Sequence, residues 1–405
     1  MNIGILTFYK VANFGANLQG ISTYFYLKNK GYHPIFFNYV SEATESTLNK
    51  EYQTNSQTRC HLDFVNKMIP EQSENLHNST EVIAAIEKHN IDAIIIGSDA
   101  VVQHHPLLSR IHQGKRKPFY IARPAPERMF PNPFWGIGFS EIIPTAMMSV
   151  SSQNSRYAQF SKKLKKRMGT TLSCMKYISV RDTWTKDLMH SINEKLEISI
   201  TPDPVFAFNN NVSNLILTES DIRTHFNLPE HYILVSLHSQ SLSPQILSEL
   251  HDQFKAIGKT CVAFPMPGGI KFNHSFDYQI NTPLSPIDWY ALIKYADAYI
   301  GSNMHPIIVS LHNAVPCFSI DHWGTKNFFN KTIRDGSSKV EHILNIYGLK
   351  NNIRPIDNGF CDIKADEIVK AIIKFPKKEV METSKLQHKM YEKMMDKILS
   401  SLTHQ

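Results

Sequence analysis

The sequence has no long apolar run and few cysteines. No segment of the 405 residues approaches the roughly 18 consecutive apolar residues that a membrane-spanning helix requires. The first residues, MNIGILTFYK, show no basic stretch followed by a long apolar segment, so we expect no signal peptide. The five cysteines are odd in number and scattered without a CxxC pair, which is typical of reduced thiols. We therefore expect a cytoplasmic protein.

Signatures of metal and nucleotide chemistry are missing as well. The sequence contains no HExxH motif, no DxD motif at a strand end and no GxGxxG motif, so we expect neither a bound metal nor a dinucleotide. The net charge is +7, and its densest basic cluster is Lys162–Arg167. No DNA-reading motif accompanies it, which argues against nucleic acid. The cluster is either a solvated helix face or a peripheral contact with anionic lipid at the inner face of the plasma membrane.

The sequence does contain two series of apolar runs that alternate with helical patterns. The first series begins with the expected strand Ile3–Phe8, and the second restarts at Tyr232–Leu237, after the break at Asp203-Pro204. A chain of this length also exceeds what one core usually organises. We predict an α/β protein of two doubly wound Rossmann-like domains that face a cleft. Their predicted ranges are 1–208, the probable acceptor side, and 209–380, followed by a helix within 381–405 that could cross back to the first domain.

Two uncharged or acidic motifs follow predicted strands, at the edge where open parallel sheets bind ligands. The first is Asn13-Phe14-Gly15-Ala16-Asn17-Leu18-Gln19, whose glycine would let the backbone approach an anion or a sugar hydroxyl. The second is Gly97-Ser98-Asp99, where a carboxylate at the cleft would suit hydrogen bonds to substrate hydroxyls. The alternatives are a plain tight turn for the first motif and a helix N-cap for the second.

Two further motifs carry a cation and a histidine. Arg181 lies where a strand passes into a helix, although a cation there opposes the helix dipole. A guanidinium at this place makes sense if it binds a carboxylate or phosphate with both arms; the alternative is a surface arginine. In Ser302-Asn303-Met304-His305-Pro306, His305 falls in the first turn of a predicted helix, and we expect it to be catalytic rather than structural.

These motifs, taken in order, resemble the polysaccharide pyruvyl transferase family over roughly residues 1–350. The opening IGILTF…NFGANLQ is similar to that family's IGILTF…NYGAxLQ, and ISVRDTWTKDLM is similar to its SVRE-type helix entry. The other matching segments are GSDAVVQHH, TPDPVF, SPIDWYALIKYADAYIGSNMHPIIVSLHNAVPCFSI and SSKVEHILNIYGL.

The resemblance implies a fold similar to the two-domain B-type glycosyltransferases. It also implies transfer of a pyruvyl group from phosphoenolpyruvate to a sugar of a cell-surface glycan, free or lipid-linked, with no further cofactor. His305 would be the general acid, and Arg181 would hold the anionic groups of the donor. The expected substrate-binding residues are Asn13, Gly15, Asn17, Gln19, Ser98, Asp99, Ser302, Asn303, Met304 and Lys339.

The chain departs from the family pattern beside the histidine. Some members have Ser-Arg-Leu-His where this chain has Ser302-Asn303-Met304-His305, so a donor arginine is missing at Asn303, and Pro306 replaces a glycine of the other common form. The candidates to supply the missing positive charge are Lys339, Arg123, Arg128 and Arg156. Two alternatives stay open: a B-type glycosyltransferase that uses a nucleotide sugar, and a catalytically degenerate scaffold in glycan assembly.

Overall fold

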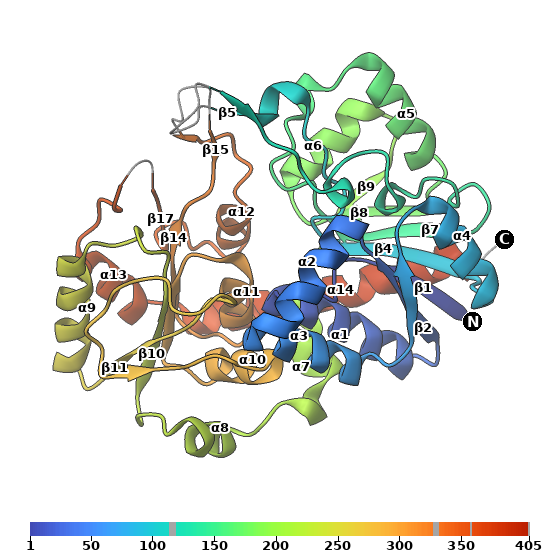
Figure 1. Ribbon diagram of the computed structural model, residues 1–405. Helices are drawn as coiled ribbons and strands as arrows, with labels where there is room; N and C mark the ends of the chain where they lie inside the picture. The colour runs from blue at the N-terminus through green and yellow to red at the C-terminus, as the bar shows by residue number, and fades with distance from the viewer. Residues whose placement is uncertain (113–118, 327–331, 357–358, 404–405) are drawn as a thin grey trace.

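The computed structural model describes residues 1–112, 119–326, 332–356 and 359–403. It contains two large parallel sheets, one in each half of the chain (Figure 1). The seven-stranded sheet has the order β3-β2-β1-β4-β7-β8-β9, and the six-stranded sheet has the order β12-β11-β10-β13-β14-β17. In both, the order runs outward in two directions from the first strand, as in doubly wound folds.

The first sheet comprises β1 (Asn2–Leu6), β2 (His33–Tyr39), β3 (Gln72–Leu76), β4 (Ala93–Asp99), β7 (Thr145–Val150), β8 (Tyr177–Val180) and β9 (Ile198–Ile200). The second comprises β10 (Tyr232–Ser236), β11 (Thr260–Ala263), β12 (Tyr278–Gln279), β13 (Ala298–Gly301), β14 (Cys317–Asp321) and β17 (Ile353–Pro355). Two short antiparallel pairs, β5 (Ile111–His112) with β6 (Tyr120–Ile121) and β15 (Thr325–Lys326) with β16 (Thr332–Ile333), lie outside them.

Fourteen α-helices lie among the described residues and connect or cover these strands. Their bounds are α1 (Phe14–Asn29), α2 (Glu42–Thr54), α3 (Ser56–Met68), α4 (Ser79–Lys88), α5 (Lys162–Leu172), α6 (Thr183–Ile192), α7 (Phe208–Asn211), α8 (Glu219–Phe226), α9 (Pro244–Ala256), α10 (Pro286–Lys294), α11 (Met304–His312), α12 (Lys339–Ile346), α13 (Ala365–Ile373) and α14 (Lys377–Thr403). A 3₁₀ turn, η5 (Pro204–Ala207), precedes α7.

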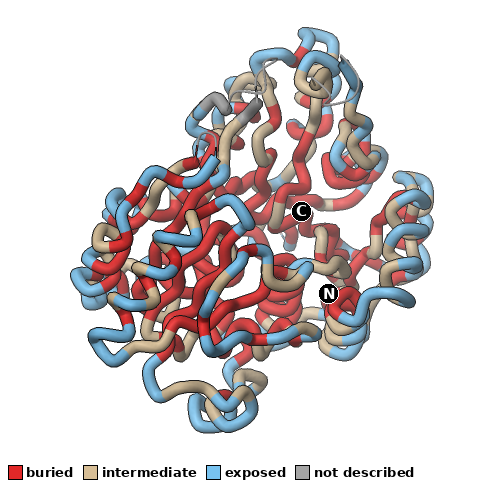
Figure 2. The backbone as a smooth tube through the Cα atoms, turned by 60° about the vertical axis from the view of Figure 1, so that its left-hand side comes forward, coloured by how far each residue is buried: buried red, intermediate tan, exposed pale blue. Residues whose placement is uncertain are grey.

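The central strands form because they are apolar without alternation, as strands covered on both faces must be. Every residue of β7 and β10 is buried, and β4 is buried up to Ser98. Figure 2 shows the buried backbone concentrated in the two sheets, while the outer helices alternate between buried and exposed residues. The edge strand β3, QSENL, is polar, and the sequence analysis did not predict it.

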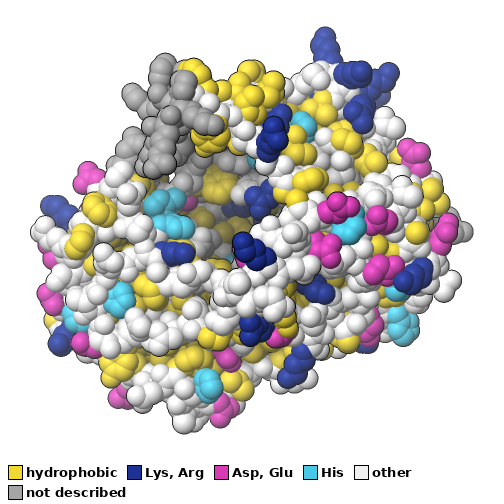
Figure 3. Space-filling view, in the orientation of Figure 1, with side chains coloured by type: hydrophobic (Ala, Val, Ile, Leu, Met, Phe, Trp, Pro, Cys, Tyr) yellow, Lys and Arg dark blue, Asp and Glu magenta, His cyan; other side chains and the backbone are white. Residues whose placement is uncertain are grey.

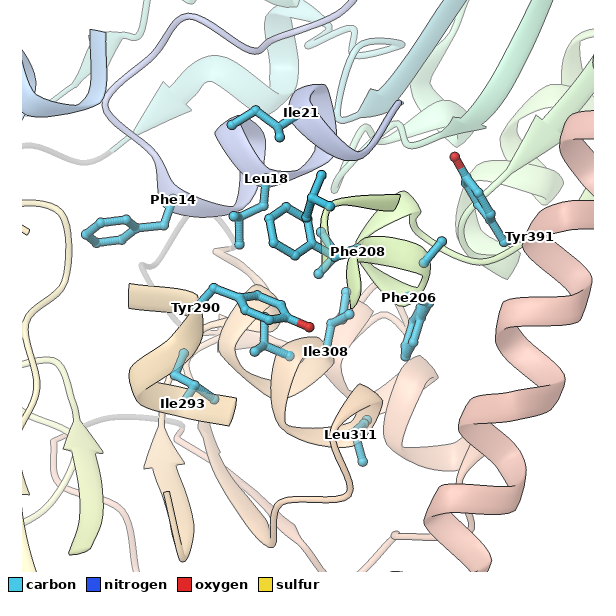
Figure 4. Close-up of a cluster of buried hydrophobic side chains, with 14 of the residues drawn as sticks. Phe14, Leu18, Ile21, Phe206, Phe208, Tyr290, Ile293, Ile308, Leu311 and Tyr391 are labelled. Carbon is cyan, nitrogen blue, oxygen red and sulfur yellow. The ribbon is translucent and has the colours of Figure 1, made fainter. Parts of the chain in front are cut away.

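One continuous apolar cluster joins the two domains beneath the cleft (Figure 4). Leu18 of α1, Phe208 of α7, Tyr290 of α10 and Ile308 of α11 are all buried in it. Within the same cluster, Phe14 stacks on Trp289 with ring centroids 4.9 Å apart. Since α1 and α11 pack on the same cluster, their N-terminal ends are held side by side at the floor of the cleft.

The last helix, α14, begins after the second sheet and lies against β7 and β8 of the first sheet (Figure 1). Its residues Tyr391, Met394 and Met395 are buried in the shared cluster, and Tyr391 packs edge-on against Tyr26 of α1. The helix therefore ties the end of the chain to the first domain, at the back of the cleft.

Candidate active site

Loops that follow strands of both sheets meet between the domains, where two cavities open. Figure 3 shows a hollow there, with Lys, Arg and His side chains gathered on its rim. The interdomain cavity, about 470 Å³, is lined from both domains and includes Arg181 and His305. The first-domain cavity, about 520 Å³, is lined by residues such as Tyr39 and Arg128. Both cavities share Asn13, Asp99 and Lys339, so together they form one connected site.

A buried ion pair lies at the centre of this site. Arg181, directly after β8, is 4% exposed, and its Nη1 lies 2.7 Å from Oδ2 of Asp203, which is 1% exposed. Its Nη2 lies 3.6 Å from Oδ1 of Asp99. Burial alone would lower the pKa of Arg181, but Asp203 and Asp99 outweigh it and raise that pKa. Arg181 is therefore a permanently charged group held between two carboxylates.

This pairing adds to two expectations drawn from the sequence. Arg181 lines the interdomain cavity, as expected; its Nη1 is bound by Asp203, whereas its Nε and Nη2 have no hydrogen-bond partner among the described residues. Asp203 was interpreted only as part of a domain break, yet it also accepts hydrogen bonds from Gln19 Nε2 and from the backbone N–H of Val205. The signal was present: Asp203 follows β9 at the sheet edge where the other motifs lie.

His305 lies in the first turn of α11 and faces the ion pair. Its Nε2 is 3.9 Å from Oδ2 of Asp203, beyond hydrogen-bonding distance, and has no other partner among the described residues. The side chain is 15% exposed. Burial lowers the pKa of His305, Asp203 and Asp99 act to raise it, and Arg181 and Lys339 lower it further, with a net decrease. An imidazole with an unpartnered nitrogen is thus available at the cavity wall.

Asp99 and Lys339 lie where the two cavities join. Burial would raise the pKa of Asp99, but Arg181, Lys339 and His305 hold it below its usual value, so the carboxylate stays ionised. Burial, followed by the charge of Arg181, lowers the pKa of Lys339 to about 8. Regular secondary structure positions both side chains: Asp99 is the last residue of β4, and Lys339 is the first residue of α12, after the N-cap Ser338.

Of the four cations considered for the missing charge, only Lys339 lines the interdomain cavity together with His305. Lys339 lines both cavities, and Arg128 lines the first-domain cavity only. Arg123 is exposed, and neither Arg123 nor Arg156 contributes to the walls of these two cavities. Ser302, Asn303 and Met304 all line the interdomain cavity, and the Asn303 side chain makes no capping hydrogen bond to α11.

Three other predicted binding residues form the frame of the site rather than its surface. Asn17 is buried, donates to the carbonyls of Tyr9 and Val11 at 2.6 and 3.0 Å, and its Oδ1 lies 2.7 Å from His61 Nδ1. The expectation that Asn17 binds substrate is therefore not supported by its position.

Gln19 and Ser98 are buried in the same way. Gln19 donates to Asp203, and the hydroxyl of Ser98 donates to the carbonyl of Ser149 at 2.9 Å. Asn13, in contrast, caps α1 by accepting from Ala16 N and lines both cavities. Gly15 lines the interdomain cavity against His305. The framework therefore includes Asn17, Gln19 and Ser98, whereas the exposed Asn13 and the buried Gly15 line the cavity.

Neither a metal cluster nor a membrane span is found in the described part of the chain. Within residues 1–112, 119–326, 332–356 and 359–403, no three His, Cys, Asp or Glu side chains lie close enough together to hold a metal ion. Over the same ranges no helix is both long and apolar enough to cross a bilayer.

Solved structures with a similar fold come from sugar-nucleotide enzymes. The UDP-GlcNAc 2-epimerase of Neisseria meningitidis, bound to UDP-GlcNAc, aligns with a TM-score of 0.54 at 10% identity, over 99% of this chain and 100% of that chain. The UDP-GlcNAc 2-epimerase of Methanocaldococcus jannaschii aligns with a TM-score of 0.53 at 11% identity, over 99% of each. Likeness at this identity shows the fold alone. It confirms the predicted pair of Rossmann-like domains, similar to the B-type glycosyltransferases.

Sequence comparison gives a more specific relationship. A family model described as polysaccharide pyruvyl transferase matches residues 13–324, which include NFGANLQ and the later motifs except the tail segment, and which leave out IGILTF, β1 and β17. A search of curated protein sequences returned no significant match.

Proposed function

This chain belongs to the polysaccharide pyruvyl transferase family, and from that premise we propose that it forms a pyruvate ketal on a sugar. The donor is phosphoenolpyruvate, and the acceptor is a pair of hydroxyls of a cell-surface polysaccharide or its precursor. The observation that carries the proposal is the unpartnered Nε2 of His305, at the wall of a cavity that also presents an ionised carboxylate and two lysines.

The reaction needs a proton donor and charge stabilisation. The methylene carbon of the donor gains a proton, one acceptor hydroxyl bonds to C2, and the bond from C2 to the phosphate oxygen breaks. The second hydroxyl then bonds to C2 and closes the ketal. Of the two hydroxyl protons, one replaces the proton given to the methyl group and the other leaves with phosphate. In this proposal His305 supplies the first proton as general acid.

The buried carboxylates favour the positive charge that develops at C2. Asp99 faces the junction of the two cavities and would also accept a hydrogen bond from an acceptor hydroxyl. The Arg181–Asp203 pair holds this carboxylate and His305 in place, and Lys339 would contact the donor carboxylate. Preorganised charges of this kind are worth most in a site from which substrate binding displaces water.

The first-domain cavity is proposed for the acceptor. It opens beside Asp99 and is lined by polar side chains, including Asn38, Asn75 and Gln103, whose amides suit sugar hydroxyls. A lipid-linked acceptor would bring the protein to the cytoplasmic face of the membrane. The basic residues Lys162, Lys163, Lys166 and Arg167 are exposed on α5, and Leu107, Leu108 and Ile121 are exposed near the same end of the first domain (Figure 1).

Mass spectrometry tests the proposal. A strain that lacks this protein should have a surface glycan lighter by about 70 daltons per modified repeat, the mass of one pyruvyl ketal. Purified protein with phosphoenolpyruvate and that glycan should restore the increment and release phosphate. A second measurement compares donors: phosphoenolpyruvate should raise the melting temperature, since only a native-state ligand stabilises. Protection by nucleotide sugars instead, with an unchanged glycan mass, would contradict pyruvyl transfer.

Vesicles test the membrane contact separately. The protein should co-sediment with vesicles that contain anionic lipid and not with neutral ones, and the binding should weaken with salt. Replacing Lys163 and Lys166 with Glu should abolish it, whereas the same change at the exposed Lys255 and Lys374 on the second domain should not. Equal binding of both variants would show that the α5 cluster is a solvated helix face.

A further inference from the structure

The second sheet has its own ligand-binding position, which the proposed mechanism does not use. Its strand order reverses between β10 and β13. The connections diverge there: α9 packs with α13 on one face, and α10 and α11 pack together on the other. Open parallel sheets bind ligands at the carboxyl ends of the strands beside such a reversal. In this chain His238 follows β10, and Ser302 follows β13.

A connected group of imidazoles and hydroxyls occupies this position. The rings of His238 and His322 lie 4.8 Å apart at 85° to each other. Nε2 of His322 lies 2.7 Å from Ser241 Oγ, which lies 3.2 Å from Ser302 Oγ. His238 and Ser302 line the interdomain cavity that contains His305. The two histidines are exposed, so their contacts with each other and with Ser241 are not needed to fill a core.

A lysine from a neighbouring strand completes the group. Lys271 follows β11 and lines the same cavity. A methyl group at Gly268 would come within 2.8 Å of Lys271 Nζ, so the glycine leaves room for the ammonium to fold over the loop. Within the described ranges Lys271 forms no ion pair with a carboxylate at 4.0 Å or less. Unlike Arg181, it therefore has an unmatched charge in the cavity.

These groups favour one class of ligand. An ammonium, an imidazole N–H and a hydroxyl that converge from three loops are hydrogen-bond donors to a tetrahedral oxyanion. Partial burial of the His238 ring, followed by the charge of Lys271, lowers the pKa of His238, which favours the neutral imidazole with one N–H to donate. The cavity residues that follow β10 and β11 include no carboxylate; Asp321, which ends β14 and also lines this cavity, accepts a hydrogen bond from Ser338 Oγ.

We propose that His238, Lys271 and Ser302 form a phosphate-binding subsite in the second-domain wall of the interdomain cavity. The inference rests on the proposed function: phosphate held here places the rest of an enol phosphate toward His305, across the same cavity. His322 and Ser241 are positioning residues, because they act through His238 and Ser302. The same chemistry would accept the phosphates of a nucleotide or of a carrier-linked sugar.

Calorimetry with three ligands tests the subsite. Inorganic phosphate, phosphoenolpyruvate and UDP are titrated into the full-length wild type and into Lys271→Gln and His238→Gln, with Lys255→Gln, an exposed lysine of α9, as the matched control. A lost charged hydrogen bond corresponds to roughly 10- to 100-fold weaker binding. We expect that loss for phosphate in both cavity variants, and unchanged binding in the control.

The ligand that loses affinity identifies the source of the phosphate. Parallel losses for phosphate and phosphoenolpyruvate support an enol-phosphate occupant. Parallel losses for phosphate and UDP, with no phosphoenolpyruvate binding, support the subsite but contradict pyruvyl transfer. Wild-type affinity for all three ligands in both variants, or no binding of any of them to the wild type, would overturn the subsite whatever the activity.

A kinetic split tests the positioning residues. Ser241→Ala and His322→Gln should raise the KM for the phosphate-bearing substrate several-fold and leave kcat near the wild-type value, because they alter binding rather than proton transfer. Ser241→Thr, which keeps the hydroxyl, should restore most of the affinity. An equal loss in Ser241→Thr and Ser241→Ala would assign these residues a packing role only and remove this support for the subsite.

Discussion

The backbone of Gly15 lies directly against the imidazole of His305, although the two residues are separated by 290 positions and belong to different domains. A Cβ added at Gly15 would come within 2.0 Å of His305 Cγ and within 2.1 Å of Nδ1. Real Cβ atoms do not approach other atoms so closely, and Cγ lies at the base of the side chain, so the whole ring would have to move. The glycine of the first motif therefore defines the position of the histidine of the last.

Gly15→Ala should lower turnover by on the order of 100-fold, and the overpacked contact should cost about 1–3 kcal/mol of stability. Alanine suits the first turn of α1, but its methyl group would displace the ring of His305 from Asp203 and the cavity. A misplacement of about 1 Å can cost on the order of 100-fold in rate. Steady-state kinetics and thermal melting give the two readouts.

Gly169→Ala is the matched control for Gly15. Gly169 lies in helix α5, away from the cleft, and an added Cβ would meet Ile192 only at an ordinary 3.5 Å. This variant should keep full activity and gain up to about 1 kcal/mol of stability from helix propensity. If Gly15→Ala retained normal turnover as well, the contact would have no role in placing His305.

His305→Gln and His305→Ala should lose turnover without a comparable loss of donor affinity. A general acid contributes roughly 10²- to 10⁴-fold in rate. Burial lowers the pKa of His305 in the free protein, and the two anionic groups of a bound donor would raise it, so the acid is protonated mainly in the complex. The kcat should therefore fall as the pH rises above the pKa of the bound state. The same change at His225, exposed on α8, should have no effect, and normal turnover in His305→Gln would make the histidine structural.

Arg181→Ala should destabilise the protein as well as inactivate it. The sequence alone suggested an arginine that binds anionic groups of the donor or lies at the surface, but the side chain is buried between Asp203 and Asp99. Removing one partner of a buried pair leaves an unmatched charge and costs about 3–5 kcal/mol. Urea unfolding should be measured for Arg181→Ala, Asp203→Ala and the double variant. The loss of unfolding free energy in the double variant should be smaller than the sum of the losses in the two single variants.

The exposed pair of Lys370 and Asp366 provides the comparison. Its atoms lie 2.7 Å apart, as in the buried pair, but both side chains are in solvent on α13. Single and double alanine variants there should change the free energy of unfolding very little. Additive effects in the buried pair would show that Arg181 and Asp203 are not energetically coupled.

The sequence predicted the sheets better than it predicted the roles of polar residues. The apolar run Tyr177–Val180 predicts a strand, and polar capping residues predict helix starts at Pro244, Pro286 and Met304; the structure has all four, because these signals are local. The basic pattern over Asn154–Arg167 also predicts a helix, but the observed helix begins only at Lys162, where Ser161 caps it. Strand β3 was missed because an edge strand exposed on one face carries little apolar signal.

Side-chain direction is what the sequence could not supply. Asn13 and Asn17 stand one helical turn apart in one motif, yet the first lines the cavities and the second is buried against a loop. Asp203 could not be assigned to Arg181 because the pairing depends on how β8 and β9 align. The resemblance to a family located the site, and the three-dimensional contacts separated its framework from its accessible surface.

Asn17→Ala should lower stability and leave the kinetic constants unchanged below the melting transition. The change leaves the carbonyls of Tyr9 and Val11 and the ring of His61 without their partner in a buried place. Unsatisfied buried groups cost about 1–3 kcal/mol each. Asn29→Ala, at the other end of α1 with one 3.4 Å contact to the carbonyl of Asn211, should be nearly neutral. A rise in KM in Asn17→Ala at full stability would instead restore its predicted role in substrate binding.

Lys339 should make the free energy of unfolding depend on pH between about pH 8 and pH 10.5. Its pKa is lowered from 10.5 to about 8 in the folded chain, first by burial and then by Arg181. Between these values the unfolded chain binds a proton that the folded chain does not, so stability rises with pH across the window. Below about pH 8 both states are protonated, and the folded state carries the full cost of a buried ammonium. An unfavourable buried ammonium at this position is consistent with a lysine whose charge binds a ligand.

Lys339→Met removes the charge and keeps the length of the side chain, so it isolates this contribution. The variant should be more stable than the wild type at pH 7, and the difference in the free energy of unfolding should shrink steadily from pH 8 to pH 10.5. Lys163→Met, at an exposed position of α5, is the control in the same series. The stabilised Lys339→Met variant should also bind phosphoenolpyruvate more weakly, because the donor loses a cation that both cavities share. Parallel stability profiles for wild type and Lys339→Met would show that the ammonium is solvated and does not carry the charge missing at Asn303.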